Sequence, residues 1–292
     1  MITTPDGAPE AFLVAQVHPP GYVHAQALTE FAECVYFGLR RLGVPAFYRE
    51  RPDRAVRAIV IGAHLLPAQA LAALPANAIL YNSEQVDRES IWLRGPYREA
   101  LRTRPVWDYS DENIRRFAAL GIESARHVPL GFVPELARIP RAEADIDVLF
   151  YGSVNERRKR ILDALAHCGL KVVSLFGVYG AERDRMIARA KVVLSVHFYE
   201  AKIFEIVRAA YLFTNAKALV AECGPDTVVD AELRDAMCAV PYERLVDTCV
   251  ELVHDTARRR ALGEQAQRLF ARRREEDILA RALGITPPGP GA

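Results

Sequence analysis

The sequence predicts an α/β protein built from two doubly wound domains, and three observations lead to this fold class. Short apolar, β-branched runs alternate with helical patterns, which is typical of parallel sheets covered by helices on both faces. The alternation occurs twice, and a segment rich in proline and charge, residues 128–145, separates the two series. Apolar residues make up 51% of the 292-residue chain, enough for a core in each domain. We therefore expect one domain over residues 1–135 and another over residues 136–292.

The first series contains six candidate strands. These short apolar runs lie at residues 12–17, 44–48, 56–62, 78–81, 105–109 and 126–129. Helical patterns separate them, at residues 28–39, 69–74, 89–101 and after Ser110. We expect Ser110 to cap the last of these helices through Asn113, because a serine side chain accepts a hydrogen bond from the backbone three residues on.

The second series repeats this pattern with five candidate strands. They lie at residues 148–151, 172–176, 192–196, 219–221 and 238–241. Residues 242–283 are almost entirely helical in pattern and rich in Arg and Glu, and we assign them to the second domain.

The overall composition argues against several classes of function. The formal net charge is +1, so the charge balance does not favour nucleic acid or an anionic membrane as a partner. Five scattered cysteines without CxxC spacing argue against a disulfide framework or a zinc site and suit a reducing cytoplasm. No apolar run approaches about 18 residues, so we expect no membrane span. A DxD sequence at residues 145–147 precedes a strand rather than following one, and we expect no metal site.

The segment 191–222 predicts a strand, a helix and a second strand, with polar residues in the first turn. His197 and Lys202 lie in this turn, and Glu205 and Arg208 follow Lys202 at intervals of three residues, on one side of the helix. One interpretation is the solvated face of an amphipathic helix. The other is a ligand site, because open parallel sheets bind ligands where strands end and helices begin.

A second candidate site follows the strand at residues 148–151. Gly152 allows close approach of a ligand to the backbone, and Ser153 can cap the next helix. Asn155, Arg158 and Lys159 occupy its first turns, where cations oppose the helix dipole unless an anion such as diphosphate joins them. A turn glycine followed by surface basic residues is the alternative. No GxGxxG or GxxxxGK[ST] motif is present.

Three stretches carry a resemblance to a known family. They are WDYSDENIRRFAALGIESARHVPLGF before the connector, DVLFYGSVNERRKRIL after it, and the segment from residue 191 that ends in ALVAE. Together they resemble GT-B glycosyltransferases of the family 1/4-like group. The donor motif departs from the common pattern, because Glu200 and Glu205 are closely spaced and no glycines follow Glu200.

The resemblance implies two Rossmann-like domains that face each other across a cleft. The first would bind a small-molecule, glycan or protein acceptor, and the second a nucleoside-diphosphate sugar such as a UDP-sugar. The sugar would pass to an acceptor hydroxyl or amine without a metal, and the sugar nucleotide would be a co-substrate rather than a cofactor. Glu205 would bind the ribose hydroxyls and Lys202 the diphosphate, while Tyr179 would stack on the base. The remaining residues that would contact the donor are Gly152, Ser153, Asn155, Arg158, Lys159 and His197.

The resemblance also suggests catalytic and acceptor residues in the first domain. A histidine in the first loop is the general base of many inverting enzymes of this type, which points to His18 or His24. His24 lies at a predicted helix start, where the helix dipole would keep the imidazole neutral. In a retaining enzyme neither histidine would need to act as a base. Asn82 and Glu84 follow a strand and can bind acceptor hydroxyls, although an ordinary polar turn accounts for them equally well.

Two other functions remain compatible with these patterns. A nucleotide-sugar epimerase or hydrolase would use the same donor pocket with acids near the sugar. A non-catalytic module would only bind the sugar nucleotide.

Overall fold

The computed structural model describes residues 10–49, 56–86, 93, 95–198, 203–225 and 227–286. The chain forms two compact units. Unit 1 comprises Met1–Val133 and Arg273–Ala292, and unit 2 comprises Pro134–Arg272. The division differs from the predicted one at the C-terminus, where the last helix belongs to unit 1 rather than to the second domain.

Unit 1 contains a parallel six-stranded sheet in the order β2-β1-β3-β4-β5-β6. Phe12 of β1 lies opposite Ala46 of β2 on one side and opposite Arg57 of β3 on the other. The chain moves outward from β1 to β2, then returns past β1 to β3 and continues in the other direction. The strands are β1 (Phe12–Gln16), β2 (Ala46–Tyr48), β3 (Arg57–Ile61), β4 (Ile79–Asn82), β5 (Val106–Asp108) and β6 (Ala125–His127).

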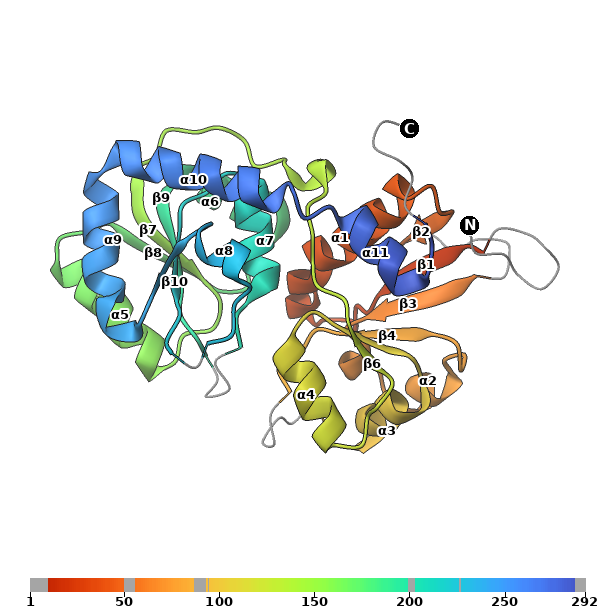
Figure 1. Cartoon of the computed structure of the whole chain (residues 1–292). Coiled ribbons are helices and arrows are strands. Elements are labelled where there is room, and N and C mark those ends of the chain that lie inside the picture. The colour runs from red at the N-terminus through yellow and green to blue at the C-terminus, as the bar shows by residue number, and fades with distance from the viewer. Residues whose placement is uncertain are drawn as a thin grey trace. The chain divides into compact units, whose positions relative to one another are not determined.

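Helices cover both faces of the unit 1 sheet (Figure 1). One face carries α1 and α11, which pack against each other, and the other carries α2, α3 and α4. Gly38 allows the close packing of α1 on α11, since a Cβ there would lie 2.5 Å from Glu275 Cγ. The bounds are η1 (Val23–Leu28), α1 (Thr29–Arg41), η2 (Ala63–Leu65), α2 (Ala68–Ala73), α3 (Gly95–Thr103), α4 (Asp111–Ala119) and α11 (Glu275–Leu283).

The apolar face of α11 accounts for the place of the C-terminal segment in unit 1. Ile278, Leu279 and Ala280 are buried, and burial of such side chains is the main source of stability for a short helix. At the start of α4, Ser110 accepts the backbone N–H of Asn113 at 3.3 Å, which confirms the predicted cap.

Unit 2 contains a parallel five-stranded sheet in the order β11-β10-β9-β7-β8. Val148 and Phe150 from β7 point into a core with α5 (Glu156–His167) and α9 (Leu245–His254), together with Val192 and Leu194 from β9. On the other face, α6 (Gly180–Arg189) contacts β7 and β9, and α7 (Ile206–Thr214) packs against α10 (Thr256–Phe270). The strands are β7 (Ile146–Tyr151), β8 (Val172–Leu175), β9 (Ala190–Ser195), β10 (Leu219–Glu222) and β11 (Cys238–Val240).

Two helix starts in unit 2 differ from the sequence prediction. The helix after β7 is capped by Asn155, whose Oδ1 accepts the N–H of Arg158 at 3.0 Å, so the predicted cap Ser153 is wrong. The helix after β9 begins at Ile206, and Glu205 occupies its N-cap position. The bounds are η4 (Pro134–Leu136), α5 (Glu156–His167), α6 (Gly180–Arg189), α7 (Ile206–Thr214), α8 (Ala231–Arg234), η5 (Tyr242–Arg244), α9 (Leu245–His254) and α10 (Thr256–Phe270).

A helix that spans a bilayer needs a long and almost entirely apolar stretch. Within the described ranges, every helix is too short or too polar to meet this need.

Gly263 provides a test of the packing of α10 on the turn after α7. A Cβ at this position would overlap the backbone carbonyl oxygen of Ala216. Alanine favours a helix over glycine by about 1 kcal/mol, but the overlap forces the backbone apart and costs about 1–3 kcal/mol. We expect Gly263→Ala to lower the thermal midpoint, measured by scanning calorimetry. The neighbouring Glu264→Ala is the control and should leave the midpoint nearly unchanged; an increase for Gly263→Ala would contradict this packing.

Candidate functional site

The candidate site lies at the carboxyl edge of the unit 2 sheet, where β7 and β9 end. β7 is the first strand of this unit, and the chain passes from it to β8 on one side and to β9 on the other. Helices that leave two such neighbouring strands in opposite directions open a crevice at the carboxyl ends, where parallel sheets bind ligands. Gly152 follows β7, and Val196 and His197 follow β9.

Gly152 adopts a backbone conformation that favours glycine. Its φ is +131°, and a Cβ there would lie 3.3 Å from Arg208 Nη2 and 3.6 Å from Arg158 Nη1. Two guanidinium groups therefore lie beside a backbone segment that has no side chain of its own. A side chain at this position would be strained and would crowd both arginines.

Arg158 and Arg208 share one carboxylate, that of Glu205. Arg158 Nη2 lies 3.0 Å from Glu205 Oε1, and Arg208 Nη2 lies 2.8 Å from Glu205 Oε2. The side chains of Arg158 and Arg208 are 4% and 12% exposed, whereas that of Glu205 is 24% exposed. Solvent therefore reaches the carboxylate more readily than the guanidinium group of Arg158.

Backbone and hydroxyl oxygens hold the two arginines in position. Arg158 Nε donates to the Val196 carbonyl and Nη1 to the Ser153 carbonyl, both at 2.8 Å. Arg208 Nη1 donates to Ser195 Oγ at 3.3 Å, while its buried Nε has no partner among the described residues. These bonds fix the guanidinium groups at the ends of β7 and β9, and Arg208 keeps donor capacity.

The electrostatic balance of this cluster is positive. Burial alone would raise the pKa of Glu205, but the guanidinium groups of Arg208 and Arg158 outweigh it and hold that pKa below its ordinary value. The carboxylate is therefore ionised at neutral pH, and two positive charges surround one negative charge. The N-termini of α5 and α7 lie at the same edge and add their partial positive charge. The cluster can accept an anion.

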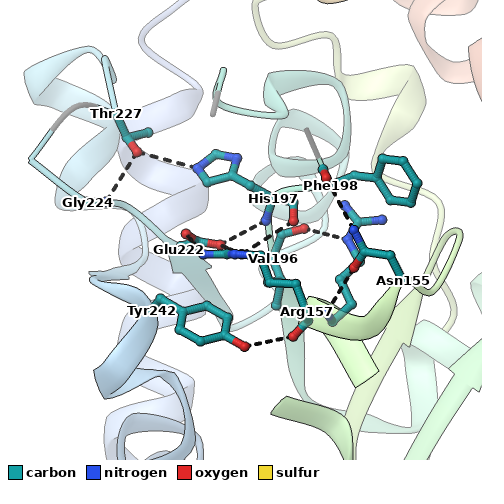
Figure 2. A network of polar contacts seen from close by, with 10 residues as sticks. Asn155, Arg157, Val196, His197, Phe198, Glu222, Gly224, Thr227 and Tyr242 are labelled. Atoms are coloured by element: carbon teal, nitrogen blue, oxygen red, sulfur yellow. Dashed lines mark hydrogen bonds and ion pairs between the residues drawn. The ribbon is translucent and has the colours of Figure 1, made fainter. Parts of the chain in front are cut away.

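A second ion pair lies at the neighbouring strand end (Figure 2). Arg157 forms a two-pronged pair with the buried carboxylate of Glu222, the last residue of β10, and its guanidinium stacks on Tyr242 with 4.0 Å from Cζ to the ring centroid. Glu222 also accepts the backbone N–H of His197 at 3.0 Å. This arrangement locks the turn after β9.

His197 is buried beside these groups. Its Nε2 lies 3.4 Å from Thr227 Oγ1. Burial lowers the pKa of His197, and the negative charges of Glu222 and Glu205 only partly oppose this shift. We therefore expect a neutral imidazole at pH 7, which can donate one hydrogen bond and accept another but carries no charge.

The other predicted donor residues differ in how close they lie to the arginine cluster. The carbonyl of Ser153 accepts from Arg158, and Asn155 Nδ2 donates to the Phe198 carbonyl at 3.3 Å. Lys159 lies on an exposed part of α5 and pairs with Asp163 at 2.6 Å, so it does not join the cluster. Tyr179 precedes α6 and is half-buried. Lys202 lies outside the described residues.

In unit 1, a histidine–glutamate pair occupies the equivalent sheet edge. His64 follows β3 and Glu84 follows β4, and His64 Nε2 lies 3.3 Å from Glu84 Oε1. Their side chains are 5% and 21% exposed. Burial lowers the pKa of His64 to about 4 and raises the pKa of Glu84 to about 7. Glu84 therefore changes protonation near neutral pH at a sheet edge where parallel sheets bind ligands.

Asn82 lies inside unit 1, where its side chain is fully hydrogen-bonded to neighbouring residues. It is fully buried, and its Nδ2 donates to Asp108 and to the Glu84 carbonyl, each at 2.6 Å. Its Oδ1 accepts the Tyr97 hydroxyl at 2.9 Å. Both ends of the amide are occupied inside the unit, so this geometry gives no support to acceptor binding by Asn82, which stays a prediction. Asn82 supports the turn that carries Glu84.

The two histidines proposed as general bases lie in the loop after β1. His18 is exposed, and partial desolvation of its ring together with the charge of Arg49 lowers its pKa. His24 lies in the first turn of η1, with its ring 5.5 Å from that of Tyr22 in an edge-on arrangement. The catalytic role of either histidine stays a prediction.

Several site residues were not assigned a role from the sequence. The sequence spacing of Arg208 places it near Glu205 on the helix but does not distinguish it from a surface charge. Glu222 ends a buried strand, and His64 comes three residues after one. A polar residue at such a position was the available signal for both. Within the described part of the chain, no group of three or more His, Cys, Asp or Glu side chains is arranged to hold a metal ion.

Sequence comparison gives distant relatives. No protein-family model matches the chain. The uncharacterized protein L140 of Acanthamoeba polyphaga mimivirus is 26% identical over 185 residues, which cover 61% of this chain and 59% of L140. The uncharacterized protein L138 of the same virus is 30% identical over 110 residues, which cover 37% of this chain and 12% of L138.

Structural comparison identifies the fold. HepE of Anabaena, solved in complex with UDP and glucose, matches with a TM-score of 0.60 at 14% identity, covering 94% of this chain and 99% of HepE. The β-glucosyltransferase of phage T4 matches with 0.59 at 12% identity, covering 94% and 100%. AviGT4, a glycosyltransferase involved in avilamycin A biosynthesis, matches with 0.55 at 15% identity, covering 94% and 96%. These proteins are GT-B glycosyltransferases, and the chain has the GT-B fold, as the resemblance implied.

Proposed function

We propose that this protein is a glycosyltransferase that moves a sugar from a nucleoside-diphosphate sugar to a hydroxyl or amine of an acceptor. The observation that carries the proposal is the pair of guanidinium groups, Arg158 and Arg208, beside Gly152 at the carboxyl edge of the unit 2 sheet. The GT-B fold supports it, and the complex of HepE with UDP and glucose makes a UDP-sugar the first donor to test.

The cluster suits a diphosphate in charge and geometry. Arginine presents several N–H groups in a fixed plane that matches the oxygens of phosphate. The negative charge that develops on the departing diphosphate would lie between two guanidinium groups and the N-termini of α5 and α7, which lowers the barrier to its departure. In this proposal the arginines replace a metal ion. Lys202 remains a proposed further contact.

Glu205 has a double role in the proposal. Its two oxygens hold Arg158 and Arg208 apart and in position. A carboxylate has about four lone-pair directions, so it can also accept hydrogen bonds from the ribose hydroxyls. Its partly exposed side chain leaves room for these contacts.

On the acceptor side we propose that Glu84 takes the proton of the attacking group. Its pKa of about 7 suits a general base at neutral pH, and His64 lies beside it. His18 and His24 remain alternative bases. The acceptor is proposed to be a small molecule, a glycan or a protein. Because the phage T4 relative in fold is described as a DNA-modifying enzyme, nucleic acid belongs in the acceptor panel as well.

Arg208→Ala tests the donor site. We expect the dissociation constant for UDP, measured by calorimetry, to rise at least about tenfold, since a hydrogen bond to a charged group contributes about 1.5–3 kcal/mol. Arg244→Ala is the matched control, because Arg244 is an exposed arginine that pairs with Asp247 in the same unit. Equal UDP affinity in the wild type and a folded Arg208→Ala variant would contradict the placement of the diphosphate.

Glu84→Gln tests the acceptor side by its pH dependence. In the wild type the carboxylate form must be present, so we expect kcat to rise with pH through about 7. Glu84→Gln should lose about 10²–10⁴-fold in kcat and lose this rise, while the KM for the donor stays unchanged. Glu112→Gln, a partly exposed site on α4, is the control. A Glu84→Gln variant that keeps both the wild-type kcat and the increase of kcat with pH would assign the general base to another residue. Separately, release of free sugar in the absence of an acceptor would indicate a hydrolase.

A further inference from the structure

A separate cavity of about 740 Å³ lies at the opposite, amino-terminal edge of the unit 1 sheet. Its wall includes the first residues of β3, β4, β5 and β6 and the C-terminal ends of α3 and α11. It therefore lies away from His64 and Glu84, which follow the carboxyl ends of β3 and β4. The proposed donor site is in the other unit.

Arginine side chains dominate the charge of this cavity. Among the described lining residues, five arginines stand against a single carboxylate, that of Glu123. This local excess of positive charge contrasts with the net charge of +1 for the whole chain. The five arginines are Arg57, Arg102, Arg104, Arg126 and Arg281.

Structural roles account for part of this arginine cluster. Arg104 donates to the Leu74 carbonyl at 2.8 Å, Arg57 to the Asn77 carbonyl at 2.9 Å and Arg102 to the Leu120 carbonyl at 3.0 Å. Carbonyl groups are neutral, so these bonds anchor the guanidinium groups without cancelling their charge. Arg102 lies in the last turn of α3, where the helix dipole is negative, but a helix end carries only about half a charge.

Two arginines of the cavity have no such anchor. Arg126, in β6, and Arg281, in the last turn of α11, are exposed and make no side-chain hydrogen bond or ion pair with any described residue. The anchored arginines and these two line one concave space in which Glu123 is the only carboxylate among the described lining residues. Like charges held together in this way repel one another until an anion joins them.

We propose that this cavity binds a compact anion that carries two or more phosphate groups. Planar guanidinium groups bind phosphate oxygens in pairs, and several of them around one cavity match several phosphates on one molecule. The volume falls within the range of about 300–1,000 Å³ that is usual for small-molecule sites. A concave site of this size, on a chain of nearly zero net charge, fits a small ligand better than a nucleic acid duplex.

Calorimetry with inorganic tripolyphosphate tests this assignment. We expect the wild type to bind it, with an affinity that falls as salt concentration rises. In an Arg208→Ala background, which weakens the proposed donor site, the double variant Arg126→Ser/Arg281→Ser should bind at least about tenfold more weakly than Arg208→Ala alone. Arg244→Ser/Arg268→Ser removes two exposed arginines of unit 2 and is the control for net charge, since both side chains lie outside the cavity. It should bind as the wild type does.

Further measurements separate binding in this cavity from binding at the donor site and from unspecific attraction of anions. The proposed donor site also binds a diphosphate, so Arg208→Ala removes that contribution, and the tripolyphosphate binding that persists in this variant is assigned to the cavity. Loss of all tripolyphosphate binding in Arg208→Ala would overturn the inference. Three further results would overturn the inference. The wild type could fail to bind tripolyphosphate, or it could bind citrate as tightly as tripolyphosphate. It could also bind duplex DNA more tightly, in a way that depends on Arg126 and Arg281. A titration with ATP distinguishes the source of the phosphates. Tighter binding of ATP than of tripolyphosphate indicates that the natural ligand is a nucleotide. Equal or weaker binding of ATP indicates an inorganic polyphosphate.

Discussion

The sharing of one carboxylate by Arg158 and Arg208 is the interaction on which the proposed donor site depends. Two nearly buried guanidinium groups repel each other, and Glu205 offsets this repulsion at the cost of its own desolvation. Such a cluster adds little to stability compared with an apolar core of the same volume. Its value lies in holding positive charge in place before the ligand arrives, so that little reorganisation is needed when a diphosphate binds.

The same topology places polar groups at the carboxyl edges of both units. Each sheet starts with a strand that has its second strand on one side and its third on the other. In unit 2 this point carries Gly152 and the arginine cluster. In unit 1 the strand ends carry His64 and Glu84, and the buried Asn82, which also donates to Asp108, supports the turn that carries Glu84. Repetition of one architecture therefore gives two sites with different chemistry, one cationic and one suited to proton transfer.

The central strands of both sheets were predictable because they are buried apolar runs in parallel sheets, and their sequence pattern does not depend on their neighbours. The edge strand β6 is different, because Arg126 and His127 are exposed. The residues of the site were less predictable. Arg158 and Glu205 were proposed as donor residues but not as partners, since 47 positions separate them in the chain. Asn82 looked like an open polar turn until Asp108 and Tyr97 were seen to occupy its amide. The return of α11 to unit 1 depends on packing against α1, which no local pattern reveals.

A crystal structure of the protein with bound UDP would test the central claim most directly. We predict that oxygens of the diphosphate lie about 2.7–3.1 Å from guanidinium nitrogens of Arg158 or Arg208, next to the backbone of Gly152. Glu205 should remain paired with both arginines in that complex. A diphosphate bound elsewhere, with these guanidinium groups still contacting only Glu205 and the protein backbone, would contradict the account.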